Sequence, residues 1–378
     1  MAASCIYPFD AELPSYIAET LVVDGDILAG EMTTVRLSYL TPIGMKDSGK
    51  EVMVSEVSVI DDLGKVYSGV NSGRSVYTLD TRNTGSATSF KLRISLSEPG
   101  KDYETGWIKL NEAPSATDLK YVCNQETVNI VAAFKGSGSK YYRADFTEAW
   151  EFHADFIPSC LFDPQSKSRT APFKPFPEDA DPMANYYCWS SGISREARLA
   201  TTDALAEDRV EGFVVNSIRR SDRKISVLYY IEVSLRGLSR GDYEFLNNLN
   251  VNSNNAGSLF SPVPSDILGN IRCVADTTEK VIGYIEASRV TKAHIYLDNG
   301  KLLLFTGSYG DEYLLSKPEP DEDGNIDFLQ YYQSGYRPVG QFTINGESAV
   351  FWAPLRCVDC TAAGGSKVKP AGWPNDHI

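Results

Sequence analysis

Apolar and polar residues alternate with a period of two through much of the first hundred residues. Residues 90–96, Phe-Lys-Leu-Arg-Ile-Ser-Leu, keep the alternation without interruption, and residues 52–59 carry two pairs of valines at the same spacing. Shorter runs at 21–23 and 35–37 also have strand character. This period is typical of strands with one buried face. It predicts an immunoglobulin-like β-sandwich over residues 20–110.

A stretch of few apolar residues at 111–118 separates this pattern from a second set of strands and indicates a linker. Beyond it, residues 128–131 predict a strand, and the segments 141–146 and 150–152 predict the two arms of a hairpin. We therefore expect a mainly β protein. Its second and larger β-rich domain covers residues 119–378 and has a fibronectin-type-III-like core with one short helix.

Turn and loop signals divide this second domain. The segment 164–182 holds several prolines and no clear periodicity, so it predicts a loop. A further strand is expected at 225–235. The sequences Asp298-Asn299-Gly300 and Asn345-Gly346 favour the left-handed backbone angles of type I′ turns and predict two hairpins.

The expected helix begins after Ser239, whose hydroxyl suits an N-terminal cap. Asp242 follows at a position where a carboxylate favours the positive end of a helix. The Asn-rich run 247–255 is expected to end the helix and open a long loop. The residues that would face a sheet are Tyr243, Leu246 and Leu249.

Length and charge limit the possible partners. The chain has 378 residues, which favours two domains or more, and 50 acidic against 36 basic residues give a net charge of −14. Such a charge repels phosphate backbones, so nucleic acid is not an expected partner. No run approaches the roughly 20 apolar residues that a bilayer span needs. We expect a monomer that any membrane would hold through a lipid alone.

The first five residues, Met1-Ala2-Ala3-Ser4-Cys5, resemble the end of a bacterial lipoprotein signal, in which small residues precede a cysteine that receives the lipid. Cys5 is the candidate for lipid attachment, and residues 1–19 would be a tether. The basic and apolar regions of a complete signal do not precede this cysteine. An ordinary cytosolic start with a cysteine near it therefore stays an alternative.

Six cysteines follow Cys5, an even number that an oxidising compartment could pair. Cys357 and Cys360 are spaced like half of a zinc site, but no second pair or histidines are spaced to complete one. We interpret them as structural thiols or disulfide partners. Cys188, between the aromatic residues Tyr187 and Trp189, is a third candidate structural cysteine.

Several elements in a fixed order carry a family resemblance. They are Leu21-Val22-Val23-Asp24-Gly25, Thr34-Val35-Arg36-Leu37, Cys188-Trp189, the strand 227–235, the helix 238–249, Gly257-Ser258-Leu259-Phe260, Leu268-Gly269-Asn270-Ile271, Val281-Ile282-Gly283-Tyr284, and Cys357-x-x-Cys360 followed by Gly364-Gly365, Pro370 and Trp373. This succession resembles a family of uncharacterised Bacteroidota lipoproteins, across nearly the whole chain. The resemblance implies an outer-membrane lipoprotein encoded beside a TonB-dependent receptor. It suggests nutrient capture or receptor assembly, with a nutrient ligand or that receptor as partner.

Catalytic motifs are scarce. The three histidines, His153, His294 and His377, do not form a metal-binding H-E-x-x-H arrangement or flank a plausible nucleophile. One candidate for a cation is the run 321–327, where Asp321, Asp323, Asn325 and Asp327 place oxygen-bearing side chains at alternate positions, as calcium prefers. The favoured interpretation is a solvated acidic hairpin. Apart from this possible calcium we expect no cofactor.

Tyrosine pairs suggest a different kind of site. In each pair one ring lies on either face of an extended segment, so one ring of a pair is a candidate for the surface. Tyr186, Tyr187 and Trp189 follow the Pro-rich loop and are the candidate ligand-binding residues. The alternative is ordinary packing, since tyrosine is common in strands.

The function that these observations favour is noncovalent recognition at a bacterial outer membrane. The protein would bind a nutrient ligand or dock on a TonB-dependent transporter without catalysis. Two alternatives remain open. One is a structural or adhesive cell-surface component, and the other is a hydrolase whose carboxylates are brought together only by the fold.

Overall fold

The computed structural model describes residues 20–40, 51–98, 101–166, 172–194, 196–255, 269–344 and 346–374. Within these ranges the chain is mainly β, with several sheets and a few helices, which confirms the predicted fold class. The immunoglobulin-like and fibronectin-like subclasses stay predictions. Cys5 and the predicted tether lie outside the described residues.

Eight strands between residues 21 and 109 make up most of one sheet, which we call the N-terminal sheet. They are β1 (Leu21–Leu28), β2 (Met32–Tyr39), β3 (Val54–Asp61), β4 (Val66–Gly73), β5 (Val76–Asp80), β6 (Ser89–Leu96), β7 (Asp102–Thr105) and β8 (Ile108–Lys109). The predicted alternation in β6 is confirmed, because Phe90, Leu92 and Ile94 are each at most 1% exposed. These apolar faces enclose a mostly aliphatic core.

Three short strands from the second half of the chain complete this sheet. They are β18 (Ile271–Cys273), β19 (Val281–Ile282) and β20 (Ala287–Ser288). β18 pairs with β7, while β19 and β20 pair in parallel with β1. One segment thus covers both edge strands of the N-terminal sheet, and the sequence pattern did not reveal this addition.

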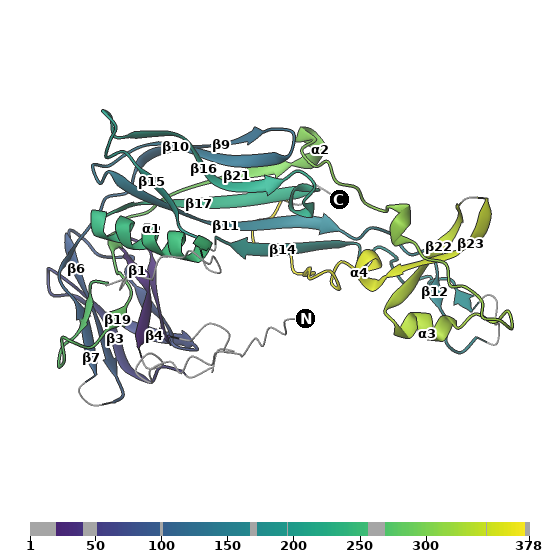
Figure 1. Cartoon of the computed structure of the whole chain (residues 1–378), viewed down its shortest axis with the longest axis horizontal. Coiled ribbons are helices and arrows are strands. Elements are labelled where there is room, and N and C mark those ends of the chain that lie inside the picture. Colours follow the sequence, from purple (N-terminus) through teal and green to yellow (C-terminus); the bar gives the residue numbers. More distant parts are fainter. Residues whose placement is uncertain are drawn as a thin grey trace, which may run out of the picture.

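The middle of the molecule is a pair of sheets that we call the central sandwich (Figure 1). One sheet contains β9 (Ser115–Cys123), β10 (Thr127–Lys135) and β16 (Arg209–Arg219); the other contains β11 (Tyr141–His153), β14 (Tyr187–Ile193), β15 (Arg198–Thr201), β17 (Leu228–Leu238) and β21 (Thr291–Asp298). Both sheets contribute to one core, with Ile130 from the first and Ile231 from the second fully buried.

Two predictions about this region are wrong. Residues 141–152 do not form a hairpin, because the whole of Tyr141–His153 is one strand that pairs with β17 without a break. The intervening Thr147-Glu148-Ala149 contains no turn-forming residue, so nothing interrupts the strand. The predicted linker at 111–118 is also partly strand, since β9 begins at Ser115.

Helix α1 (Arg240–Asn255) begins where the sequence predicts. The Ser239 hydroxyl accepts a hydrogen bond of 3.2 Å from the Asp242 amide. The Asn-rich run does not end the helix as expected, because the helix continues to Asn255. Asn250 donates a hydrogen bond of 3.0 Å to the Ala197 carbonyl, and this tertiary contact offsets the low helix propensity of asparagine.

The other helices are short. In the described ranges they are α2 (Asn299–Leu302), α3 (Phe328–Gln333), α4 (Leu355–Val358) and the 3-10 turns η2 (Arg223–Ile225) and η3 (Glu312–Leu314). The hairpin predicted at 298–300 is wrong, because Asp298 caps α2 and accepts a hydrogen bond from the Gly300 amide. None of the helices within the described ranges combines the length and apolar character needed to cross a membrane.

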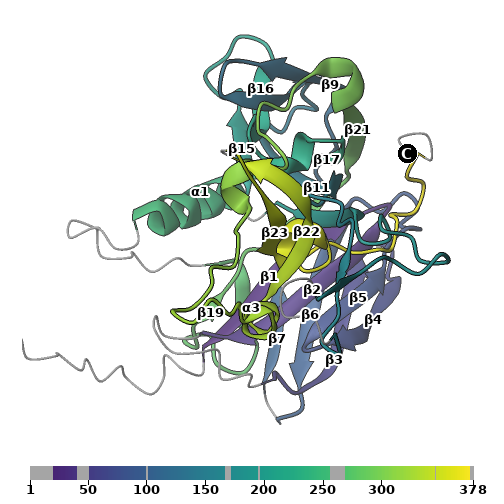
Figure 2. The same ribbon diagram turned by 90° about the vertical axis from the view of Figure 1, so that its right-hand side faces the viewer.

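Two segments of the chain extend beyond the central sandwich as a small unit that we call the distal lobe (Figures 1 and 2). It comprises the described residues within 156–185 and 308–358, with strands β12 (Leu161–Phe162), β13 (Phe173–Lys174), β22 (Tyr336–Ile344) and β23 (Glu347–Pro354). The antiparallel pairing of β22 with β23 confirms the second predicted hairpin, although its turn residue Asn345 lies outside the described residues. The lobe has two core clusters, an aromatic one around the fully buried Trp352 and a mainly aliphatic one that includes Val339 and Val358.

Candidate functional site

The three aromatic residues predicted to bind ligand do not share one surface. The Tyr186 ring stacks on His153 with the ring centres 4.7 Å apart, and Tyr187 meets the same imidazole edge-on. Trp189 is only 8% exposed and packs in a separate cluster with Trp373. The structure therefore places Tyr186 and Tyr187 at the base of the distal lobe. Trp189 lies on the face of the five-stranded sheet that is turned away from the core of the central sandwich, under Trp373.

His153 lies in a cluster of aromatic rings at the base of the distal lobe. Its ring also contacts Tyr309, with centres 3.7 Å apart, and its Nδ1 lies 2.7 Å from the Ala154 carbonyl oxygen. Burial lowers the pKa of His153, which keeps the imidazole neutral at neutral pH. Burial, together with the nearby Asp155 carboxylate, raises the pKa of the Cys357 thiol. A protonated thiol is a poor nucleophile.

The candidate structural cysteines have different roles. Cys188 of β14 and Cys360, which follows α4, form a disulfide with their Cα atoms 5.8 Å apart. Cys357 is a buried free thiol. The disulfide joins the central sandwich to the end of the distal lobe. Beside it, the Cys360 amide donates to the Asn185 carbonyl at 2.9 Å, which fixes the two neighbouring segments together.

A cavity of about 490 Å³, which we call the distal pocket, lies between these two segments of the distal lobe. One wall comes from the Pro-rich stretch and the other from β22, α4 and the end of α3. The lining residues are Pro158, Cys160, Leu161, Phe162, Lys174, Phe176, Asp181, Pro182, Ala184 and Asn185 on the first wall, and Tyr332, Arg337, Pro338, Leu355, Val358 and Asp359 on the second. Its size is in the range of small-molecule sites.

Arg337 is the most defined polar group of the distal pocket. Its guanidinium carbon lies 3.8 Å from the centre of the Tyr332 ring, and its Nη1 donates to the carbonyls of Tyr332 and Tyr336 at 3.0 and 2.7 Å. The sequence analysis missed this residue. The sequence offers one indication of its role. Arg337 lies five positions after Tyr332, directly before Pro338 and next to the first residue of β22.

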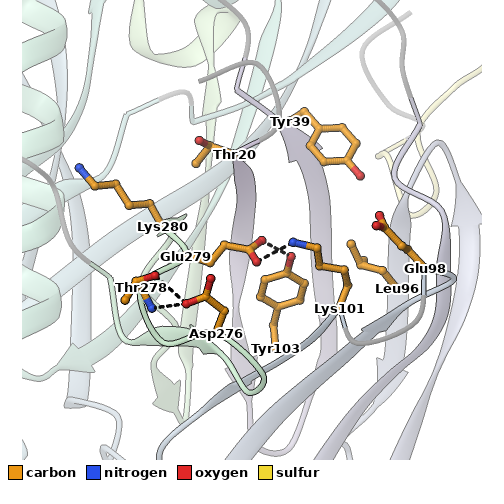
Figure 3. A pocket seen from close by; sticks show the side chains of 10 residues that line it. All are labelled: Thr20, Tyr39, Leu96, Glu98, Lys101, Tyr103, Asp276, Thr278, Glu279 and Lys280. Atoms are coloured by element: carbon orange, nitrogen blue, oxygen red, sulfur yellow. Dashed lines mark hydrogen bonds and ion pairs between the residues drawn. The ribbon is translucent and has the colours of Figure 1, made fainter. Parts of the chain in front are cut away.

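A second cavity of about 520 Å³, the N-terminal pocket, lies where the segment 276–280 crosses the N-terminal sheet (Figure 3). Glu279 points to its centre and accepts hydrogen bonds from Lys101 Nζ at 2.7 Å and the Tyr103 hydroxyl at 2.6 Å. Asp276 accepts two bonds from Thr278. The central charged groups of this pocket are thus paired with each other.

Two carboxylates of the candidate calcium site at 321–327 accept hydrogen bonds from nearby backbone amides. Asp321 Oδ1 accepts the amides of Asp323 and Asn325 at 3.0 and 2.8 Å, and Asp327 caps α3 through the Gln330 amide. Across the described ranges, histidine, cysteine and acidic side chains form no group of three that could hold a metal ion. Calcium binding stays a prediction.

Charged residues also fill the junction between the N-terminal sheet and the central sandwich. Arg236 Nη2 lies 2.6 Å from Asp26 and 3.2 Å from Asp145. Asp242, which is 1% exposed, lies within the field of Asp26 and Glu286. Burial and these two carboxylates raise the pKa of Asp242 to about 8, against the opposing effect of the two nearby arginines. The side chain is therefore mostly protonated at neutral pH.

Comparison with solved structures gives a weak likeness. A chain from the crystal structure of a DUF4785 family protein from Legionella pneumophila subsp. pneumophila str. Philadelphia 1 matches at 10% identity and a TM-score of 0.15, over 56% of this chain and 51% of that chain. The present chain thus spans about half the length of that protein, and a likeness of this size carries no argument. None of the curated proteins compared with the chain matches it.

A family model gives the stronger result. The model of the domain of unknown function DUF4249 matches residues 6–294. The matched range includes the N-terminal sheet, one wall of the distal pocket and the strands of the central sandwich up to the first half of β21. Arg337 and the rest of the second wall lie beyond it. The chain belongs to the DUF4249 family.

Proposed function

We propose that this protein is an exported, lipid-anchored ligand-binding protein that captures a small nutrient molecule in the distal pocket and does not transform it. The observation that carries the proposal is the pocket itself. It combines apolar and aromatic walls with a small number of fixed polar groups, which is the usual composition of a small-molecule site.

Hydrogen bonds and a disulfide hold the walls of the distal pocket in place before a ligand binds. The two segments that form its walls are joined through the Asn185 and Cys360 backbones, and the adjacent disulfide ties them to the central sandwich. Asn185 also donates a side-chain hydrogen bond to Asp359 at 2.9 Å. A site held in shape before binding loses less conformational entropy when the ligand arrives.

The cellular setting belongs to the same proposal. The small residues before Cys5 and the resemblance to Bacteroidota lipoproteins support a lipid anchor on an outer membrane. In that setting a TonB-dependent receptor is the proposed partner, to which a monomeric carrier passes its ligand. Mass spectrometry of protein purified from its native membrane tests the anchor, because an acylated Cys5 is expected and an unmodified cytosolic chain would contradict it.

The hydrolase alternative has less support from the same groups. A hydrolytic pair needs a general acid and a base or nucleophile with free oxygens. In the distal pocket Asp359 accepts hydrogen bonds at both oxygens, from Asn185 and from the amide and hydroxyl of Thr361. Asp181, the other lining acid, accepts the Met183 amide at Oδ1, so among the described residues the pocket offers one carboxylate with a free oxygen and not a pair. In the N-terminal pocket Glu279 is occupied by Lys101 and Tyr103.

Ligand screening with two blocking variants tests the binding proposal. Ala184→Trp adds a large side chain at an exposed residue that lines the distal pocket, and Thr20→Trp adds one at a half-buried residue that lines the N-terminal pocket. Compounds from a library of sugars, peptides, nucleosides and organic acids are ranked by thermal shift and then measured by calorimetry. We expect hits that Ala184→Trp abolishes and Thr20→Trp leaves intact.

Two results would contradict the proposal. One is a set of hits that survives Ala184→Trp with unchanged affinity, since the ligand would then bind elsewhere. The other is turnover of a glycoside, peptide or ester substrate that rises in proportion to protein concentration and disappears in one of the two variants. Melting temperatures close to that of the wild type confirm that both variants fold.

A further inference from the structure

We infer that the ligand of the distal pocket is an organic anion, with a carboxylate at one end and an apolar body at the other. This inference rests on the proposed function and adds the chemical class of the ligand. It depends on the way in which Arg337 is held and on the groups that surround it.

Arg337 is fixed on one side and open on the other. Stacking on Tyr332 and the two bonds from Nη1 hold the guanidinium plane in place. In the described part of the chain, no hydrogen bond or ion pair uses its Nε or Nη2. These two nitrogens form the edge that binds a carboxylate with two parallel hydrogen bonds. The pocket therefore contains a preorganised half of an ion pair.

The acidic residues of the pocket do not neutralise this edge by direct contact. Asp359 bonds to Asn185 and Thr361, and Asp181 accepts the Met183 amide at 2.8 Å. The other cation, Lys174, lies 3.8 Å from Asp163 and is about half exposed. The lining contains two acidic residues, Asp181 and Asp359, and two basic residues, Lys174 and Arg337, so their charges balance. The pocket therefore does not attract every anion. Contact with the Arg337 edge decides which anions bind.

The protein's net charge of −14 does not exclude this ligand class. At physiological salt the Debye length is about 8 Å, so charges on distant surfaces act weakly inside the pocket. A charge-assisted contact with Arg337 acts at hydrogen-bond distance and is much less screened. For an anion in the pocket, the attraction to Arg337 therefore outweighs the repulsion from the net charge of the protein.

The remaining lining accounts for the apolar body of the ligand. Phe162 rests on the aromatic core of the lobe, with its ring 5.1 Å from that of Tyr332, while Leu161, Phe176 and Leu355 extend the apolar wall. Burial raises the pKa of the Cys160 thiol, which keeps this residue uncharged. The lining favours a flat or branched hydrocarbon group over a sugar, because a sugar needs more hydrogen-bonding partners.

Calorimetry with three matched probes tests the inference on the wild-type protein. The probes are 4-phenylbutyrate, its neutral amide and 4-phenylbutylamine, which share one apolar body and differ in charge. We expect the carboxylate to bind about 10-fold tighter than the amide, and the amine to bind weakest. The Ala184→Trp variant is expected to bind none of them, while Thr20→Trp binds all three as the wild type does.

Two substitutions at position 337 assign the preference to the arginine. Arg337→Met removes the charge and is expected to make the carboxylate and the amide bind equally. Arg337→Lys keeps the charge without the paired donors and is expected to retain only part of the preference. Because the Arg337 bonds also hold the preceding turn, hydrogen exchange of residues 328–344 is measured to confirm that this part of the lobe stays folded.

Each outcome bears on the inference separately from the proposed function. Equal binding of the carboxylate and the amide by the wild type overturns the organic-anion class, although the pocket remains a binding site. A carboxylate preference that persists in Arg337→Met overturns the role of Arg337. If no probe binds, the inference falls, whereas the library hits and their sensitivity to Ala184→Trp still decide the proposed function.

Discussion

The N-terminal sheet and the distal lobe are stabilised in different ways. The sheet encloses an aliphatic core along long strands, and its edge strands β7 and β1 are covered by β18, β19 and β20. In the described residues, the lobe has two two-stranded sheets, the aromatic cluster of Trp352 and a smaller cluster around Val339, with a disulfide at its base. The sheet distributes its stability over many backbone pairs, whereas the lobe concentrates it in a few side chains.

The two pockets differ in whether their central polar groups are paired with each other. In the N-terminal pocket Lys101, Tyr103 and Glu279 satisfy one another (Figure 3). In the distal pocket Arg337 presents an edge that no described residue contacts by a hydrogen bond or ion pair. Regions of lower local stability commonly carry the binding function of a protein. This difference is consistent with a structural role for the first pocket and supports the binding role proposed for the second.

Replacing the central aromatic residue of the lobe is the strongest test of this contrast. Trp352→Ala removes a fully buried indole and is expected to destabilise the lobe by about 3–5 kcal/mol. Because the lobe has its own core, we expect hydrogen exchange to increase within residues 308–358 and to stay unchanged within the N-terminal sheet. Leu92→Ala is the matched control and is expected to give the opposite distribution. Equal loss of protection in both regions would show that the protein unfolds as one unit.

Removal of the disulfide tests how far the lobe depends on its attachment. The Cys188–Cys360 bond closes a sequence separation of 172 residues, and such a bond restricts the unfolded chain. The double variant Cys188→Ala/Cys360→Ala is expected to lose about 2–4 kcal/mol in urea unfolding. Cys123→Ala, at an exposed free thiol, serves as the control and should unfold like the wild type. A double variant as stable as the wild type would show that packing alone holds the lobe.

The sequence revealed the two regions to different extents, for a physical reason. The strands of the N-terminal sheet have one buried face over several residues, and a half-buried strand leaves a period of two in the sequence. β19 and β20 have only two residues each, which is too short to show a period. Their place is set by pairing with β1, and such long-range pairing has no local signature.

The site was less accessible to sequence reasoning than the fold. Tyr186 follows the Pro-rich segment in the sequence, but its ring packs on His153, and Trp189 packs in a separate buried cluster. The distal pocket is built from walls that lie more than 140 residues apart in the chain, such as Phe162 and Arg337. An arginine becomes a recognisable anion-binding group only when its stacking partner and its open edge are known.

The buried charges at the junction between the N-terminal sheet and the central sandwich predict a pH dependence of stability on the side of the molecule away from the distal lobe. In the unfolded chain Asp242 titrates near its ordinary value of 3.8, whereas in the folded protein its pKa is raised to about 8. The folded state therefore binds the extra proton between these values, and its stability falls as the pH rises through that range. Asp26, Asp145, Glu286, Arg143 and Arg236 face this region and remain in place in the experiment.

Asp242→Asn is expected to remove this loss. Relative to the wild type, the variant should gain about 1–3 kcal/mol of stability between pH 5 and pH 8, with no further gain above that range. Denaturant unfolding at one-unit pH intervals measures the difference. The exposed Asp276→Asn is the control and should show no such rise. A stability difference between Asp242→Asn and the wild type that does not change with pH would contradict the raised pKa.

The smallest expected effect concerns the N-terminal pocket. Glu279→Gln keeps the size of the side chain but loses the charge that pairs with Lys101 and Tyr103, and we expect a loss of about 0.5–1.5 kcal/mol at neutral pH. Burial alone would raise the pKa of Glu279, but the bonds from these two partners outweigh it and lower the pKa. The stability that the charge contributes is therefore present above the ordinary pKa and is lost as the pH falls through the folded value.

Unfolding measured at pH 7 and pH 3 should show the stability difference between Glu279→Gln and the wild type shrinking in acid, while the affinity for 4-phenylbutyrate measured by calorimetry should be unchanged. A change in that affinity would mean that the two pockets are coupled and that the contrast between a structural and a binding pocket is wrong.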